Sequence, residues 1–208
     1  MLRRALLIGF WLLASCGSAR AGAQREPDLS PAMRAALSGQ IAEGLAHTPH
    51  FADPAQLVRY LMWVADESAR LRRRIPDRLV RENLLQTIWY EATRAGLEPA
   101  LVLGLIQVES GFNKYAISGA GAIGLMQVMP FWTRLLGDGD PAQLLRMRVN
   151  LRYGCVILRH YIDQEHGNLF YALGRYNGSR GQAAYPDAVL AARRGWELAA
   201  RGQQLAGR

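Results

Sequence analysis

Glu109 is the residue of this sequence best suited to acid–base chemistry, because an apolar segment carries it into a glycine-rich loop. Pro99 suits the first turn of a helix and Gly111 can supply the left-handed residue that ends one, so we expect a helix over residues 99–109. Three aliphatic residues precede Glu109 at spacings of three and four: Val102, Leu105 and Ile106. This spacing predicts that the carboxyl group lies on the apolar face of the helix.

Burial on that face should raise the pKa of the Glu109 carboxyl group. Removal from water disfavours the charged form, and the negative end of the helix dipole lies at this last turn. A carboxylic acid that stays protonated near neutral pH can donate a proton to a leaving oxygen and later take one back, as in glycoside cleavage. The alternative is a glutamate that turns outward or pairs with an arginine, and the spacing alone does not separate these two interpretations.

Five short motifs follow one another between residues 109 and 178. They are Glu109-Ser110-Gly111-Phe112, Ala116-Ile117-Ser118, Gly119-Ala120-Gly121-Ala122, Gly124-Leu125-Met126-Gln127-Val128-Met129-Pro130 and Arg175-Tyr176-Asn177-Gly178. Each motif alone is weak evidence, but the ordered set is specific. Over about residues 83–190 it resembles the catalytic domain of the soluble-type lytic transglycosylases, which is close in fold to goose-type lysozyme.

The resemblance implies a mainly α, lysozyme-like α+β fold, in which a compact helical domain has a small irregular β-hairpin or loop beside the active-site cleft. It also implies that Glu109 is catalytic. The residues that would bind substrate around it are Ser118, Gln127, Met129, Tyr176 and Asn177. Among them, Tyr176 would bring its hydroxyl group to the reacting centre or to Glu109. The chain departs from the usual family pattern at Arg175, where the family has a small residue.

The sequence from Ser110 to Gly137 contains no Asp or Glu, and so offers no second carboxylate of the kind that most glycosidases use. The resemblance implies non-hydrolytic cleavage of peptidoglycan between N-acetylmuramic acid and N-acetylglucosamine, which gives 1,6-anhydromuramic acid ends. Glu109 would act first as acid and then as base, without a cofactor, and the C6 hydroxyl group of the substrate would be the nucleophile. The alternatives are a hydrolytic muramidase and an inactive peptidoglycan-binding module.

Composition predicts one compact domain with an N-terminal appendage, because half of the 208 residues are hydrophobic. The formal net charge of +8 favours an anionic partner. The arginines form no recognisable nucleic-acid-binding motif, so we expect peptidoglycan glycan strands rather than nucleic acid as the partner, and a monomer. The arginines at residues 70 and 72–74 are interpreted as favourable charges at a helix C-terminus on a solvated face, rather than as a glycan site.

Residues 1–23 read as an export signal, because Arg3 and Arg4 precede an apolar run that is too short to span a bilayer. Two processing sites compete. The run Leu13-Ala14-Ser15-Cys16 resembles a lipoprotein box, and Ala21-Gly22-Ala23 has the form of an ordinary cleavage site. We favour lipidation of Cys16, because the box directly follows the apolar run. The protein is therefore expected to be periplasmic, as an outer-membrane lipoprotein if Cys16 is lipidated.

After the signal we expect a linker and helical extension over residues 24–76, the transglycosylase domain over 77–200 and a tail over 201–208. Besides 99–109, helices are expected over residues 54–74, 77–95, 131–136, 149–165, 169–175 and 186–200. No metal is expected, because Asp138 and Asp140 lack the further ligands of a calcium loop and His160 and His166 lack partners.

Overall fold

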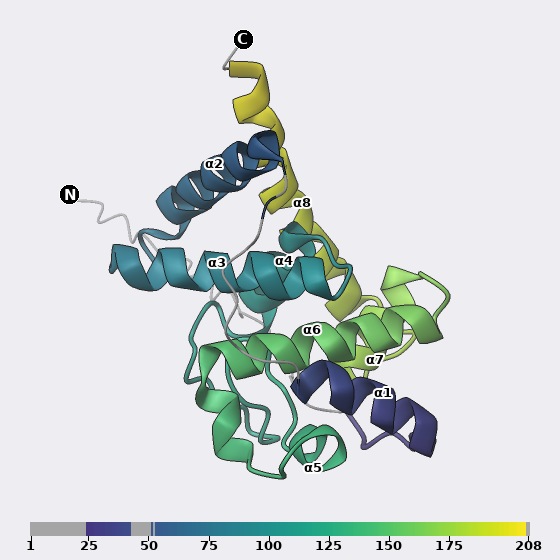
Figure 1. Ribbon diagram of the computed structural model, residues 1–208. Coiled ribbons are helices and arrows are strands. Elements are labelled where there is room, and N and C mark those ends of the chain that lie inside the picture. Colours follow the sequence, from purple (N-terminus) through teal and green to yellow (C-terminus); the bar gives the residue numbers. More distant parts are fainter. Residues whose placement is uncertain (1–23, 43–50, 52, 207–208) are drawn as a thin grey trace, which may run out of the picture.

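The computed structural model describes residues 24–42, 51 and 53–206 (Figure 1), so the export signal and Cys16 lie outside the described residues. The elements are α1 (Pro31–Ala42), α2 (Pro54–Leu71), α3 (Arg78–Arg94), α4 (Pro99–Glu109), α5 (Phe131–Leu136), the 3₁₀ helix η1 (Pro141–Leu145), α6 (Met147–Gln164), α7 (Leu169–Asn177) and α8 (Ala184–Ala206). Within these residues, the extended structure consists of two isolated antiparallel bridges, Ile117 to Ile123 and Ile123 to Val128. The mainly helical fold expected from the sequence is confirmed.

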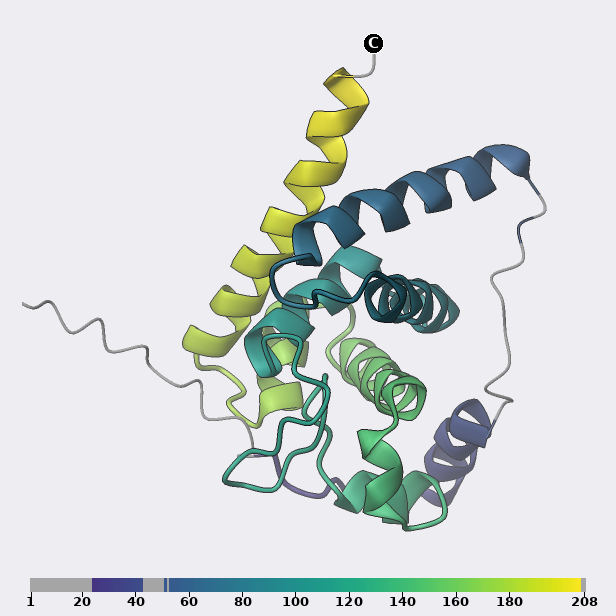
Figure 2. The same ribbon diagram turned by 90° about the vertical axis from the view of Figure 1, so that its left-hand side faces the viewer.

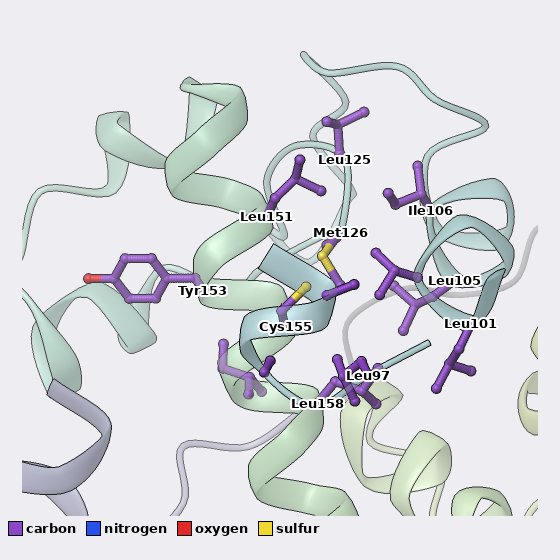
Figure 3. Close-up of a cluster of buried hydrophobic side chains, with 14 of the residues drawn as sticks. Leu97, Leu101, Leu105, Ile106, Leu125, Met126, Leu151, Tyr153, Cys155 and Leu158 are labelled. Carbon is purple, nitrogen blue, oxygen red and sulfur yellow. The ribbon is translucent and has the colours of Figure 1, made fainter. Parts of the chain in front are cut away.

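Helix α4 lies in the middle of the fold because it is apolar on every side. Six successive residues, 101–106, are buried, and a helix that is hydrophobic all round has to be surrounded. Helices α3 and α8 pack against it, α8 most extensively. On another side, Figure 3 shows the Met126 side chain between Leu105 of α4 and Cys155 of α6. The end of α4, which carries Glu109, is therefore fixed from several directions.

The backbones of α4 and α8 meet at Gly104. A Cβ atom at this position would lie 2.7 Å from the backbone nitrogen of Arg193 and 3.1 Å from the carbonyl oxygen of Val189. Rotation of a side chain cannot relieve such a contact, because the neighbouring atoms belong to the main chain. Gly104 therefore sets the distance between the two helices.

We predict that Gly104→Ala lowers the free energy of unfolding by about 2 kcal/mol, since overpacking forces the two helices apart. The matched control is Gly195→Ala on α8, where a Cβ atom would meet nothing within 4 Å. It should raise the free energy of unfolding by up to about 1 kcal/mol through helix propensity. Urea denaturation followed by circular dichroism measures both. Equal stability of the Gly104→Ala variant and the unmodified chain would contradict this description of the contact.

Helix α3 is held to α6 and to α2 by buried arginines. Arg152 of α6 forms a two-pronged ion pair with Glu91 of α3, in which Nη2 lies 2.8 Å from Oε1 and Nε lies 3.0 Å from Oε2. Arg81 donates from Nη1 to the carbonyl oxygens of Ile75 and Pro76, both at 2.7 Å, and from Nε to Ser68. Figure 2 shows α3 and α6 packed side by side and seen end-on. These contacts fix the turn between α2 and α3.

Several helix boundaries differ from those expected: α2 ends at Leu71 rather than at residue 74, α6 begins at Met147 rather than at residue 149, and α8 continues to Ala206 through most of the expected tail. Two further differences bear on the site. Helix α8 begins at Ala184 rather than at Pro186, because a proline in the first turn replaces an N–H group that has no partner within the helix. Helix α7 continues past Arg175 to Asn177, and Gly178 with φ of 85° ends it in the left-handed conformation. Both shifts place residues near Glu109 on helices rather than in loops.

Candidate active site

The Glu109 carboxyl group is half-buried at the C-terminal end of α4, and a phenol from a distant part of the chain hydrogen-bonds it. The Tyr185 hydroxyl group, in the first turn of α8, donates to Oε1 of Glu109 at 2.5 Å. Tyr185 is itself buried. When the carboxyl group is protonated, this hydrogen bond favours the proton on Oε2, because an unprotonated Oε1 is the better acceptor.

Burial raises the pKa of the Glu109 carboxyl group from an ordinary value of 4.5 to about 7, and the Tyr185 hydrogen bond lowers it by a smaller amount. The raised pKa predicted from the position of Glu109 among aliphatic residues is therefore confirmed. Within the described part of the chain, no second carboxylate contributes to this shift. A lone carboxyl group with a pKa close to neutrality can both give and take a proton near pH 7.

Tyr176 is buried close to Glu109, yet its hydroxyl group bonds elsewhere. It donates to the backbone carbonyl oxygen of Met126 at 2.8 Å. Burial raises the pKa of Tyr176 well above its ordinary value, and the negative charge of Glu109 adds to this effect. Asn177, the last residue of α7, is also buried. In this structure Tyr176 fixes the backbone of the loop at Met126, and Tyr185 takes the contact with the carboxyl group.

The two polar residues expected in the loop brace its backbone. The Ser118 hydroxyl group accepts a hydrogen bond from the Ala122 N–H at 3.0 Å and so closes the turn between the bridged segments. Gln127 has a left-handed backbone with φ of 48°, and its Nε2 atom donates to the carbonyl oxygens of Ala116 and Gly124. Met129 is half-buried against the core. These contacts give the loop one fixed shape beside Glu109.

Asn150 of α6 holds the loop in place, a role that is not predicted from the sequence. It is buried, its Oδ1 atom accepts from the Met126 N–H at 2.8 Å, and its Nδ2 atom donates to Ile123 and Leu144 carbonyl oxygens. A Cβ atom on Gly124 would lie 2.4 Å from Nδ2 of Asn150. The glycine at position 124 is therefore required by this contact as well as by its φ of 79°.

Tyr185 is the second residue whose role is not predicted from the sequence, because the last helix is expected to begin at Pro186, just after this tyrosine, whereas α8 begins at Ala184. The sequence pattern that could have placed Tyr185 on this helix is the stripe of Tyr185, Val189 and Trp196. These residues have helical spacing, and they are buried on the helix that packs against α4. Extending that stripe backwards through Pro186 would have placed the phenol on the helix.

Arg175, where the chain departs from the family pattern, forms an ion pair with Glu165 at the junction of α6 and α7. Arg180 also pairs with Glu165, at 2.8 Å. Hydrogen bonds from Arg180 first, and then from Arg175, lower the pKa of Glu165 to about 2. The larger residue is therefore accommodated by an ion pair outside the Glu109 cluster.

The cluster of Glu109, the braced loop and the α7 motif lies within a segment that matches a known family. Residues 86–188 match the family model of the transglycosylase SLT domain. A transglycosylase of Enterobacteria phage PRD1 is 36% identical over 115 residues, which are 50% of this chain and 41% of that protein. Membrane-bound lytic murein transglycosylase C of Actinobacillus pleuropneumoniae serotype 5b is 64% identical over 81 residues, 35% of this chain and 22% of that protein.

A solved structure of an inactive mutant of lytic transglycosylase Slt from Pseudomonas aeruginosa is 27% identical, with a TM-score of 0.43 over 58% of this chain and 24% of that chain. The present chain spans less than half the length of each of the two sequence relatives described above. The match to the family model identifies residues 86–188 of this chain as a transglycosylase SLT domain.

Proposed function

We propose that this protein is a lytic transglycosylase, which cleaves the β-1,4 bond between N-acetylmuramic acid and N-acetylglucosamine in peptidoglycan without water. Two sequence relatives bear transglycosylase names, and the SLT match includes Glu109, the loop and Tyr176. The observation that carries the proposal is the lone, half-buried carboxyl group with a pKa of about 7. Such a group is suited to both proton transfers of the reaction.

In the proposed reaction, Oε2 of Glu109 donates its proton to the glycosidic oxygen as the bond to C1 of the muramic acid breaks. The acetamido group of the substrate stabilises the cationic centre at C1. The resulting carboxylate then removes the proton of the C6 hydroxyl group, whose oxygen bonds to C1 and closes the 1,6-anhydro ring. Glu109 ends protonated, as it began. An intramolecular nucleophile has a high effective concentration, which suits a site with one carboxyl group.

Mass spectrometry of purified peptidoglycan digested by this protein tests the proposal. We expect fragments that end in 1,6-anhydromuramic acid. Fragments with reducing ends would instead identify a hydrolytic muramidase, and the absence of fragments would identify a binding module without activity. The binding module is disfavoured by the raised pKa of Glu109, which a purely binding surface does not need.

Tyr185→Phe tests the role of the phenol. The Tyr185 hydrogen bond lowers the pKa of Glu109, so its removal should raise that pKa further. In the unmodified protein the acid step needs the protonated carboxyl group, and its rate should fall as pH rises through about 7. In the variant this fall should move to higher pH, with about a tenfold loss of maximal rate from poorer positioning of the carboxyl group. A pH profile of kcat/KM measures both effects.

Tyr171→Phe is the matched control, because this tyrosine lies on α7 and its ring contacts Arg180 at 4.7 Å. It should leave the pH profile in place. An unchanged profile for Tyr185→Phe would show that the phenol does not act on Glu109.

We also propose an envelope location, in the periplasm and with a lipid anchor at Cys16. The support is the lipoprotein box in the sequence, together with relatives that are named membrane-bound. No helix in the described part of the chain is long and apolar enough to span a bilayer.

A further inference from the structure

A cavity of about 340 Å³ lies beside the catalytic loop, between the turn that joins α2 to α3 and the residues that follow Glu109. Its apolar side is formed by Ile75, Leu84 and Leu125. Its polar rim carries two cations from different parts of the chain, Arg74 and Lys114. Four of the ten described residues that line this cavity therefore come from the chain that precedes the SLT match at residue 86.

The wall of the cavity nearest to Glu109 is held in a strained conformation. Gly111 and Phe112 have successive positive φ values of 56° and 71°, and the second is unfavourable for a residue with a side chain. The Phe112 ring is buried and packs edge-on against Trp196 of α8, with 5.7 Å between ring centroids. Next to this wall, the Ser110 hydroxyl group donates to the carbonyl oxygen of Leu125 at 2.8 Å. The cavity is thus built onto the segment that ends the catalytic helix.

The opposite wall is also fixed. The buried Arg81 side chain holds the carbonyl oxygens of Ile75 and Pro76, and this defines the turn that presents Arg74. The Arg74 guanidinium group lies 5.6 Å from the centre of the Phe112 ring and so bridges the two walls (Figure 2 shows the turn near the end of α4). The cation is positioned before any ligand arrives, which reduces the entropy cost of binding.

The charge at the cavity is not neutralised within the described residues. Arg70, on the same helix end, pairs with Glu67 at 2.7 Å, whereas Arg74 and Lys114 have no ion pair in the described part of the chain. No described residue that lines the cavity is acidic. Two exposed cations above an aliphatic surface are complementary to a short peptide that carries free carboxylates and small apolar side chains.

We propose that this cavity is a subsite for the acidic peptides attached to peptidoglycan, with Arg74 and Lys114 binding their carboxylates. This inference rests on the proposed function, because the peptide reaches the cavity as part of the glycan that Glu109 cleaves. It also assigns a role to Arg74 beyond the favourable charge at a helix C-terminus expected from the sequence. Peptide preference then depends in part on Arg74, which lies outside the SLT match.

The test compares peptide-bearing glycan strands with the same strands after an amidase has removed the peptides. For the variant with Arg74→Gln and Lys114→Gln together, the ratio of kcat/KM on peptide-bearing strands to kcat/KM on bare strands should fall about tenfold, mainly through KM. Lys114→Gln alone changes an exposed loop residue and should lower the ratio about threefold. Arg74→Lys keeps the positive charge and should therefore keep the ratio close to that of the unmodified protein. Arg73→Gln is the matched control, because Arg73 is exposed on the same turn but does not line the cavity.

A second measurement separates this inference from the proposed function. The peptides released by the amidase are titrated into the unmodified protein and into the double variant, with binding followed by calorimetry. Binding to the first and not to the second supports the subsite even if no anhydro products form. The subsite would be overturned if the double variant left the ratio of the two kcat/KM values unchanged. It would also be overturned if Arg73→Gln and the double variant lowered that ratio equally. Anhydro products together with no peptide binding would overturn the subsite alone.

Discussion

Glu109→Gln is expected to reduce peptidoglycan cleavage about a thousandfold or more, while the protein still binds glycan strands. The amide cannot donate a proton to the leaving oxygen or remove one from the C6 hydroxyl group, and general acid–base catalysis contributes roughly 10² to 10⁴ in rate. The side chain keeps its size and can still accept the Tyr185 hydrogen bond through its oxygen. Release of anhydro fragments and co-sedimentation with peptidoglycan measure the two properties separately.

The matched control is Glu98→Gln, at the other end of the same helix, where the side chain is exposed and pairs with Arg193. This variant should cleave at nearly the normal rate. Cleavage by Glu109→Gln at a comparable rate would remove Glu109 from the mechanism, whatever the products are.

Glu109→Gln should also stabilise the fold at alkaline pH. The folded pKa of Glu109, about 7, lies above its ordinary value of 4.5, so the folded state prefers the protonated form. The contribution of this group to stability is therefore fully present below pH 4.5 and is lost as pH rises through 7. Removing the carboxylate should recover up to about 3 kcal/mol at pH 8 and almost nothing at pH 4.

The second large effect is expected at the buried ion pair between α3 and α6. Arg152→Met should lower the free energy of unfolding by about 3–5 kcal/mol, because it leaves the Glu91 carboxylate buried without its closest cation. The side chains of Arg152 and Glu91 are 1% and 3% exposed, so water cannot replace the lost contact. Chemical denaturation at neutral pH measures the difference.

Two further variants distinguish a buried charge from lost packing. The double variant Glu91→Leu with Arg152→Met removes both charges and should recover much of the loss. Arg78→Met breaks an exposed pair with Glu82 on α3 and should leave the free energy of unfolding nearly unchanged, because water screens that pair. If Arg152→Met and Arg78→Met cost the same, the buried pair does not stabilise the contact between α3 and α6.

The helices could be predicted from the sequence because prolines and glycines mark their ends. The segment from Pro99 to Glu109 is found as expected, with Pro99 in its first turn and Gly111 beyond its end. The expected start of α8 at Pro186 is wrong by two residues, because a proline is tolerated throughout the first turn of a helix and does not have to be its first residue. A proline therefore indicates where a helix starts only to within its first turn.

From the spacing of residues alone, the site is predictable only where neighbours in sequence are also neighbours in space, whereas the distant Tyr176 comes from the family resemblance. The position of Glu109 and its raised pKa could be predicted from the aliphatic residues of its own helix. The partner of the carboxyl group, Tyr185, is 76 residues away, and its contact depends on how closely α8 approaches α4 at Gly104. Asn150 likewise reaches the loop from α6, and one asparagine on a helix carries no sequence signal for that role.

The distance along the chain between Glu109 and Tyr185 has a consequence during synthesis. Until residues 184–196 have left the ribosome and packed against α4, the carboxyl group lacks its phenol, and the Phe112 ring lacks Trp196. A glutamate at the end of an undocked helix is hydrated and ionised, with an ordinary acidity. On the proposed mechanism, an incomplete nascent chain would therefore carry the glutamate without a functioning proton donor, and the ability to cleave glycan would arise only when the last helix packs against α4.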